Sequence, residues 1–236
     1  MDISIVGGTG DEGFGLALRL AKAGEHVTIG SRSVEKGQGA AEKAKAILGP
    51  DAPVDGTSNE EAVAAVDVVL VTVPYAGQAD TYRGLKSAFR PGAIVCVCTS
   101  PLATAVGGRA WQVVRPWHGS AAEQAEALVG KGVRLVSGFQ TVSGEELQNL
   151  DQSIEGDVLL CGGDAEAKGT IGSLVEKMPN LRWADAGALS MARIVETFTA
   201  VLVGVNRAYG IHTAGIALTG RAGWGAPPPK PAKADG

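Results

Sequence analysis

In the first half of the chain, short apolar runs alternate with longer segments in which apolar residues recur at helical spacing. Runs such as "ISIVG", "VVLVTV" and "AIVCVC" are continuous and rich in β-branched residues, which is typical of parallel strands covered on both faces. They predict strands at residues 3–7, 26–31, 54–57, 67–73 and 93–98, separated by helices at 13–23, 34–48, 59–66 and 76–89. This alternation predicts an α/β fold, a Rossmann-type doubly wound parallel sheet with right-handed crossovers.

The pattern loosens over residues 100–120, where two Trp, two Pro and a Gly pair predict a long functional loop. Strand-like runs resume with "VRLVSGF", "DVLLCG" and "LRWAD", and helices are expected at 165–176 and, as one long element, at 189–209. We therefore expect a Rossmann domain at residues 1–140 and a smaller C-terminal helical region at 141–218. The Pro/Gly/Ala-rich residues 219–236 have too few apolar groups to pack and predict a disordered tail.

The composition narrows the classes of partner and compartment. A net charge of −4 argues against nucleic acid as a partner, because proteins that bind nucleic acid normally carry an excess of basic residues. The continuous apolar runs are far shorter than the roughly 18 residues of a membrane span, and no signal peptide is expected. Three cysteines without framework spacing predict reduced thiols and a cytoplasmic location, with Cys96 and Cys98 as buried small hydrophobes rather than metal ligands.

A glycine-rich loop follows the first predicted strand. Gly8, Gly10 and Gly13 form a G-x-G-x-x-G between a strand and a helix, and a second strand follows. In this context the three glycines allow a tight turn, close approach of the backbone to a pyrophosphate, and close packing of helix on sheet. Asp11 and Glu12 are expected to cap the helix, with side chains facing solvent and only their backbone near the cofactor.

The second predicted strand ends without the carboxylate that normally binds the ribose of NAD. Ser31 and Arg32 stand there instead, with Lys36 one helical turn later. A guanidinium fork, an ammonium group and a hydroxyl suit a 2′-phosphate, so these residues predict NADP(H) as the cofactor.

Residues for proton transfer are few. No His, Cys or acidic cluster has metal-ligand spacing, and His26 is expected to be structural, with His118 and His212 more often surface residues than site residues. Tyr82 and Lys86 match a Tyr-x-x-x-Lys pair but follow the fourth strand, which favours an ordinary amphipathic helix. Hydride transfer between two stacked ring cofactors needs no side-chain acid or base. The scarcity of proton-transfer residues is therefore compatible with an enzyme that catalyses such a transfer.

The stretch "IVGGTGDEGFGLALRLAKAGEHVTIGSRSVEK" resembles the opening of the NADPH-dependent coenzyme F420 reductases, or F420H2:NADP oxidoreductases. "NLDQSIEGDVLLCGGDAEAK" and "LRWADAGALSMARIVETFTAVLVGVNRAYGIHTAGIAL" resemble the rest of that family. The resemblance implies an oxidoreductase, commonly a homodimer, that transfers a hydride between NADP(H) and coenzyme F420, an 8-hydroxy-5-deazaflavin.

By position, the resemblance also implies site residues. These are Thr9, Gly10, Asp11 and Glu12 for the pyrophosphate; Ser31, Arg32 and Lys36 for the 2′-phosphate; Val73, Pro74, Ser100 and Gly138 beside the nicotinamide; and Ala214 beside the deazaflavin.

Other interpretations stay open on the sequence alone. The chain could reduce another acceptor, such as a flavin or a ferric complex, or act as a non-enzymatic NADP(H) sensor. The long apolar helix could be a dimer interface. Because the deazaflavin tail carries a phosphate and carboxylates, we expect Arg109, Arg115 or Arg207 to contact it.

Overall fold

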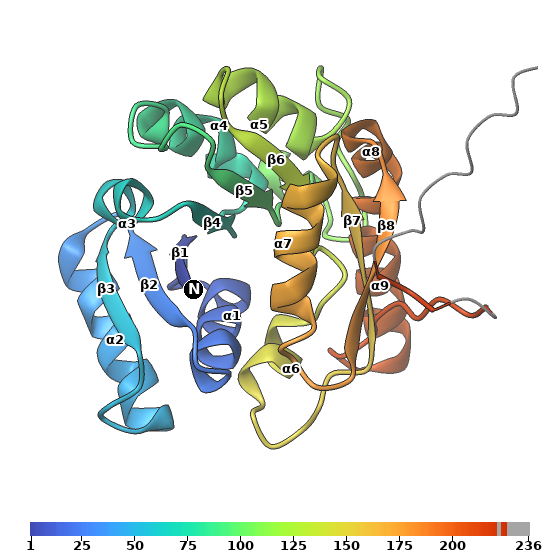
Figure 1. Cartoon of the computed structure of the whole chain (residues 1–236). Helices are drawn as coiled ribbons and strands as arrows, with labels where there is room; N and C mark the ends of the chain where they lie inside the picture. Colours follow the sequence, from blue (N-terminus) through green and yellow to red (C-terminus); the bar gives the residue numbers. More distant parts are fainter. Residues whose placement is uncertain (221–222, 226–236) are drawn as a thin grey trace, which may run out of the picture.

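Eight strands form one sheet, in the order β3-β2-β1-β4-β5-β6-β7-β8, in a computed structural model of the chain that describes residues 1–220 and 223–225 (Figure 1). The first six strands in this order run parallel. The strands are β1 (Asp2–Val6), β2 (His26–Ser31), β3 (Val54–Ser58), β4 (Val68–Val71), β5 (Ile94–Val97), β6 (Arg134–Ser137), β7 (Gly156–Cys161) and β8 (Leu181–Gly187). The predicted doubly wound parallel sheet is confirmed.

Helices cover both faces of the sheet, and each face has its own apolar core. Side chains of α1, α2 and α7 pack with one face, and those of α3, α4, α5 and α8 pack with the other. The helices are α1 (Asp11–Lys22), α2 (Val34–Leu48), α3 (Asn59–Ala65), α4 (Tyr75–Leu85), α5 (Ala121–Val129), α6 (Gly144–Gln148), α7 (Ala165–Val175), α8 (Ala192–Val195) and α9 (Phe198–Tyr209), with short 3₁₀ turns η1 (Ala103–Val106) and η2 (Leu189–Met191). β1 pairs with β2 on one side and β4 on the other, so the chain order reverses there and opens a crevice at the carboxyl ends of these strands.

Helix α5, directly after the irregular loop, was missing from the predicted elements. Ser120 caps its first turn by accepting a hydrogen bond from the Glu123 amide at 3.0 Å, and its hydroxyl lies 2.9 Å from a Glu123 carboxylate oxygen. Ser-x-x-Glu is the sequence signature of a helix N-terminus, and this signal could have revealed the helix.

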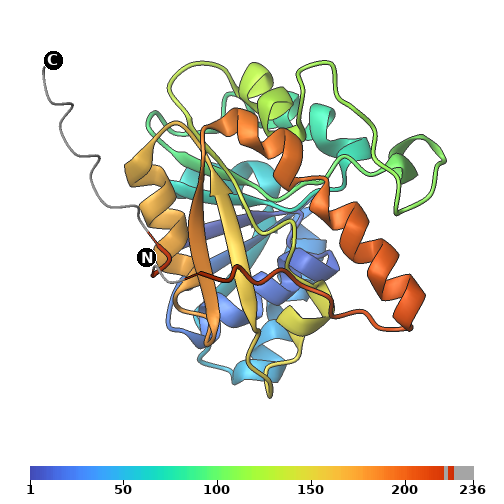
Figure 2. The same cartoon turned by 90° about the vertical axis from the view of Figure 1, so that its right-hand side faces the viewer.

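The prediction of one long helix at residues 189–209 was wrong in its continuity. Glu196 and Thr197 form a turn between α8 and α9, and Figure 2 shows the change of direction. The Glu196 carboxylate turns inward and accepts hydrogen bonds from the Ala121 and Ala122 amides at 2.7 and 2.9 Å. By length and composition alone, Leu189–Tyr209 is long and apolar enough to cross a bilayer, with a mean hydropathy of 1.3. The expectation from the sequence considered only continuous apolar runs and so missed this segment, whose apolar residues are interrupted by polar ones.

The sheet continues across the predicted domain boundary at residue 140, because β7 pairs antiparallel with β6 through Ser137 and Cys161. The division into two regions therefore stays a prediction. After α9 the chain returns over the outer strands (Figure 2), where the Asp157 amide donates to the Ile216 carbonyl at 2.7 Å. Of the predicted tail at 219–236, Gly225 bridges Ala184 of β8, and residues 221–222 and 226–236 lie outside the described residues.

Candidate functional site

The glycine loop joins β1 to α1 at the switch point of the sheet. Gly7 has a φ of +76°, a left-handed conformation that favours glycine. A Cβ on Gly13 would lie 2.5 Å from the Thr72 hydroxyl and 2.7 Å from the Gly8 Cα, so a side chain there would push the helix off the sheet. Gly10 is the N-cap of α1 and supplies no side-chain hydrogen bond to the helix. The amides of the first turn and the positive end of the helix dipole therefore suit a phosphate group.

The two acidic residues of this turn differ from each other. The Asp11 side chain is exposed, as expected. Glu12 corrects the prediction: it is half-buried, and its Oε1 atom is inaccessible to solvent and has no hydrogen-bond partner within the described residues. Burial raises the pKa of the Glu12 carboxyl to about 8. Burial mainly raises the pKa of the Cys98 thiol, and the Glu12 carboxyl adds to that rise.

A cationic cavity lies beside the glycine loop. Its volume is about 500 Å³, and its lining includes Thr9, Gly10 and Asp11 of the loop, Lys36 of α2 and Gln148 of α6. Ser31 ends β2 as a buried residue, and Arg32 follows as an exposed one. Of the residues predicted for the 2′-phosphate, Lys36 lines this cavity together with loop residues predicted for the pyrophosphate. Ser31 and Arg32 lie at the end of β2, before the start of α2, and do not line it.

Sequence reasoning missed a second lysine of this cavity. Lys43 lines it together with Lys36, Gly39 and Ala40. These positions recur at the spacing of one helix face, so the predicted helix at 34–48 already contained the signal. The Lys36 and Lys43 side chains supply two cations along the same face of α2.

Close backbone packing fixes the turn that carries Arg32. A Cβ on Gly37 would lie 2.3 Å from the Thr57 carbonyl oxygen, so α2 touches β3 without an intervening side chain. Asn59 of α3 accepts a hydrogen bond from the Gly7 amide at 3.2 Å and so ties α3 to the glycine loop. Sequence reasoning also missed this positioning role of Asn59, because 52 residues separate the two partners.

The residues predicted to flank the nicotinamide lie at the carboxyl ends of three adjacent strands. Val73 and Pro74 follow β4, Ser100 follows β5 and Gly138 follows β6. The Thr99 hydroxyl donates to the Val73 carbonyl at 2.8 Å, and the Gly138 amide donates to the Val97 carbonyl at 3.2 Å. These bonds hold the strand ends in one row.

Ser100 is tied to α9 by a chain of hydrogen bonds. The Thr199 hydroxyl donates to the Gln140 carbonyl at 2.8 Å and lies 2.6 Å from the Ser100 hydroxyl oxygen. Thr199 has one hydroxyl proton, so Ser100 is the donor in the second contact. Within the described residues no group donates to the Ser100 hydroxyl, so its oxygen can accept a hydrogen bond. The Gln140 side chain donates through Nε2 to the Val97 carbonyl at 2.9 Å and to the Ser137 hydroxyl at 2.7 Å, which holds the loop after β6.

A second cavity, of about 300 Å³, lies between this loop and α9. Asp11 lines it as well as the cationic cavity, so both cavities border the start of α1. Ala214, predicted beside the deazaflavin, lies on the wall of this second cavity, and its amide donates to the Asn206 side chain at 3.0 Å. His212 lines the same cavity as an exposed residue.

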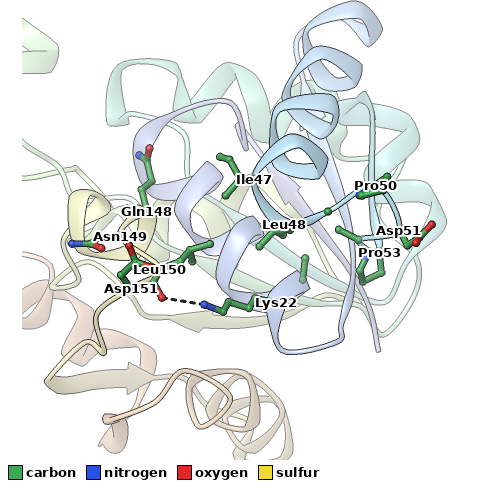
Figure 3. A pocket seen from close by; sticks show the side chains of 13 residues that line it. Lys22, Ile47, Leu48, Pro50, Asp51, Pro53, Gln148, Asn149, Leu150 and Asp151 are labelled. Carbon is green, nitrogen blue, oxygen red and sulfur yellow. Dashed lines mark hydrogen bonds between the residues drawn. The ribbon is translucent and has the colours of Figure 1, made fainter.

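A larger cavity, of about 730 Å³, lies at the other end of α1 (Figure 3). Lys22, Leu48 and Leu150 are part of its wall, and the Lys22 ammonium donates to the Leu150 carbonyl at 3.0 Å. None of the site residues predicted from the sequence lines this cavity. This cavity is larger than the other two, but neither the glycine loop nor the carboxyl ends of β4, β5 and β6 line it. We therefore do not assign the dinucleotide site to it.

Tyr82, Lys86 and His26 line neither the cationic cavity nor the second cavity. Tyr82 is fully buried and stacks on Phe89, whereas Lys86 is exposed. His26 lies 2.9 Å from Asp55 at the sheet edge. The three cysteines are buried and free, and residues 1–220 and 223–225 contain no His/Cys/Asp/Glu group that could hold a metal.

A doubly wound sheet with an uncapped glycine turn at its switch point and a cationic turn after β2 defines a Rossmann-type dinucleotide-binding protein. Comparisons with known proteins define the family. A family model described as "NADP oxidoreductase coenzyme F420-dependent" matches residues 2–101. The chain is 41% identical over 222 residues to the F420-dependent NADP reductase of Methanocaldococcus jannaschii, covering 93% of this chain and 98% of that protein. It is 37% identical over 221 residues to the protein of the same name from Methanothermobacter thermautotrophicus, covering 93% and 95%.

A solved structure agrees with this fold. The putative F420-dependent NADP reductase of Arthrobacter sp. FB24 superposes with a TM-score of 0.76 at 22% identity, covering 93% of this chain and 99% of that one. The chain belongs to the family of F420-dependent NADP reductases, and the resemblance seen in the sequence is confirmed.

Proposed function

We propose that the chain is an oxidoreductase that transfers a hydride directly between NADP(H) and the deazaflavin coenzyme F420. The observation that carries this proposal is the pair of cavities that share Asp11 at the start of α1. One has the cations of α2 on its wall, and the other lies under α9 and Ala214. Two ring cofactors that bind from these two sides would meet at the carboxyl ends of β4, β5 and β6. The names of the relatives at 37–41% identity support both cofactors.

The residues fit NADP on physical grounds. The N-terminus of α1 has amides for the pyrophosphate, and Gly8 and Gly13 leave no space that a Cβ could occupy. Ser31, Arg32, Lys36 and Lys43 offer a hydroxyl and three cations for the 2′-phosphate, with a fork geometry at Arg32 that an ammonium group lacks.

The protein's task is to bind and align two rings and to exclude water. When bound, the nicotinamide and the deazaflavin supply the carbon atoms between which the hydride passes, so no side-chain acid or base is required. We propose that Val73, Pro74 and Gly138 support the nicotinamide and that Ser100 accepts a hydrogen bond from its carboxamide. Thr199 orients Ser100, and the segment that contains Ala214 covers the deazaflavin.

The test is spectrophotometric. Purified protein, NADPH and oxidised F420 should bleach the visible band of the deazaflavin, whereas NADH should do so far more slowly. FMN and a ferric chelate replace F420 in parallel samples. Bleaching of FMN or reduction of iron without reaction of F420 would identify a reductase of another acceptor. Tight NADPH binding without turnover of any acceptor would identify a sensor.

We further propose that the chain works as a homodimer in the cytoplasm, without nucleic acid or membrane partners. Val201 and Tyr209 of α9 are exposed to 59% and 78%, and Ile194 of α8 to 54%, so this apolar face lacks cover within the described chain. The Glu196 side chain buried between α8 and α5 favours packing of the segment against protein over a span in lipid. Light scattering on the eluted protein should give a dimeric mass, and Val201→Asp should shift it to that of the monomer.

A further inference from the structure

Two arginines from distant parts of the chain meet over one aromatic ring. The guanidinium carbon of Arg207, in α9, lies 4.0 Å from the ring centroid of Trp111. That of Arg109, in the irregular loop after β5, lies 5.3 Å from the same centroid. Trp111 is half-buried and packs beside Gly204 of α9, so the ring has a fixed support.

This cluster carries positive charge without compensation. Arg109 and Arg207 are both exposed, and neither side chain forms an ion pair with residues 1–220 or 223–225. Two cations over one ring repel each other, and an anion between them removes that repulsion. The net charge of the chain is −4, so the attraction for an anion is local to this cluster.

Helix α9 connects this cluster to the second cavity, and none of the three residues lines the cationic cavity at the glycine loop. Asn206 lines that cavity and binds the Ala214 amide, and Arg207 is the next residue. Thr199, which holds Ser100, lies eight residues before Arg207 in the same helix, an axial distance of about 12 Å. A ring seated at Ser100 would therefore extend its side chain along α9 toward the two guanidinium groups.

We propose that Arg109, Trp111 and Arg207 form an anion subsite for the phosphate and carboxylate tail of the deazaflavin. The subsite rests on the proposed function and names where that substrate's tail binds. Guanidinium forks pair with phosphate and carboxylate oxygens, and the indole ring holds both forks in place. Arg115, in the same loop, belongs to a different cavity, with Glu196 and Arg193 on its wall, and is not part of the subsite.

The experiment compares F420 with its tailless deazariboflavin analogue, which has the same ring and ribityl chain but no phosphate or carboxylates. Fluorescence titration gives the Kd of each compound, and NADPH-dependent bleaching of the same samples reports turnover. The wild-type protein should bind F420 more tightly than the analogue. In the double variant R109Q/R207Q the Kd of F420 should rise about 10- to 100-fold, as expected for loss of charged hydrogen bonds at an exposed site. Each single variant should give part of this effect.

The analogue is the internal reference, because its Kd should stay the same in the double variant. R115Q removes one charge from the same loop and should leave both Kd values unchanged, with thermal unfolding used to check that each variant folds. An unchanged ratio of the two Kd values in R109Q/R207Q would overturn the subsite, and so would an equal loss for both compounds. Binding of F420 without bleaching by NADPH would instead reject the proposed function and leave the binding comparison valid.

Discussion

The hydroxyl oxygens of Ser100 and Thr199 lie 2.6 Å apart and connect the end of β5 to α9 across 99 residues of sequence. Thr199 donates its only hydroxyl proton to the Gln140 carbonyl, so the Ser100 hydroxyl must donate to Thr199. Helix α9 therefore sets the direction of the Ser100 hydroxyl. The strand end predicted to contact the nicotinamide and the helix that lines the second cavity are therefore one hydrogen-bonded unit. A change in either should alter the alignment of the two cofactors.

Replacement of Thr199 by Val tests this connection. The variant keeps the shape of the side chain but removes the acceptor for Ser100 and the donor for Gln140. We expect kcat/KM for F420 to fall about 10-fold, because Ser100 loses the hydrogen bond that orients its hydroxyl, a contribution of about 1.4 kcal/mol. Thr197→Val is the matched control, because that hydroxyl donates to Ile194 at 2.6 Å and does not contact Ser100. Equal losses in the two variants would contradict the alignment role.

Arg32→Ala tests the choice of cofactor. Loss of a guanidinium from a phosphate should weaken NADP binding by about 2–3 kcal/mol, roughly 30- to 150-fold, and barely change NAD binding. Lys43→Ala should act in the same direction with a smaller effect, about 5-fold. Lys45→Ala is the control on the same helix, because its ammonium lies 3.6 Å from Asp55 and does not line the cavity. Calorimetric titration with both dinucleotides measures all four proteins, and parallel losses for NADP and NAD would refute the 2′-phosphate assignment.

Glu12 should make NADP binding depend on pH. Burial raises the pKa of this carboxyl to about 8, so it is mostly neutral at pH 7 and ionises as the pH passes that value. The new anion lies in the first turn of α1, beside the expected pyrophosphate, and repels it. We expect the Kd for NADP to rise about 3- to 10-fold between about pH 7 and pH 9. Glu12→Gln should remove that rise, whereas Asp11→Asn, at an exposed side chain, should retain it. A slope that persists in Glu12→Gln would assign the effect to another group.

Glu196 should make stability depend on pH. Burial raises the pKa of its carboxyl from 4.5 to about 7 in the folded protein, although two backbone amides bind it. A raised pKa means that the folded state holds the proton more tightly, so this stabilisation is complete below about pH 4.5 and is lost as the pH rises through 7. The difference corresponds to about 3 kcal/mol of unfolding free energy.

Urea unfolding at several pH values measures this contribution. Glu196→Gln should lose the part of the pH dependence that comes from ionisation of this carboxyl. Because glutamine has one side-chain oxygen, one α5 amide loses its acceptor, and the variant should be less stable than the wild-type protein at low pH. The pKa of Glu12 is also raised, to about 8, so its ionisation should further lower the stability of the wild-type protein between pH 7 and 8. An unchanged pH profile in Glu196→Gln would show that the carboxyl ionises at its ordinary pH.

Asp157 should control the segment at residues 214–218, which we propose covers the deazaflavin. Its carboxylate accepts hydrogen bonds from Arg182 at 2.8 and 2.7 Å and from the Leu218 amide at 2.5 Å. Asp157→Asn should speed hydrogen exchange at residues 214–218 and raise KM for F420 about 5-fold, with little change in KM for NADPH. Asp185→Asn is the control, because it breaks another ion pair of β8, with Lys168, and Asp185 has no hydrogen bond to residues 214–218. Equal effects on both cofactors would indicate general loss of structure.

The sequence by itself determined the features that lie within one strand–helix–strand unit. Gly8, Gly10, Gly13, Arg32 and Lys36 occupy a stretch of 29 residues, and local geometry fixes where a loop and the end of its neighbouring strand must lie. The helical periodicity of residues 34–48 also places Lys43 on the same face as Lys36. The Ser120-x-x-Glu123 sequence likewise indicates the start of α5, so both features could be predicted from the sequence. The apolar runs determined a doubly wound sheet because parallel strands covered on both faces require them.

The tertiary structure alone decided what lies between distant segments. The burial of Glu12 depends on which side chains close over the start of α1, and its pattern in the sequence is that of an ordinary helix cap. The break at Glu196 depends on α5 lying near enough for its amides to bind the carboxylate. The approach of Thr199 to Ser100 and of Arg207 to Trp111 depends on how α9 packs against the segments that follow β5 and β6. Short-range periodicity carries no information about such contacts, because their energy arises only after the sheet has brought the segments together.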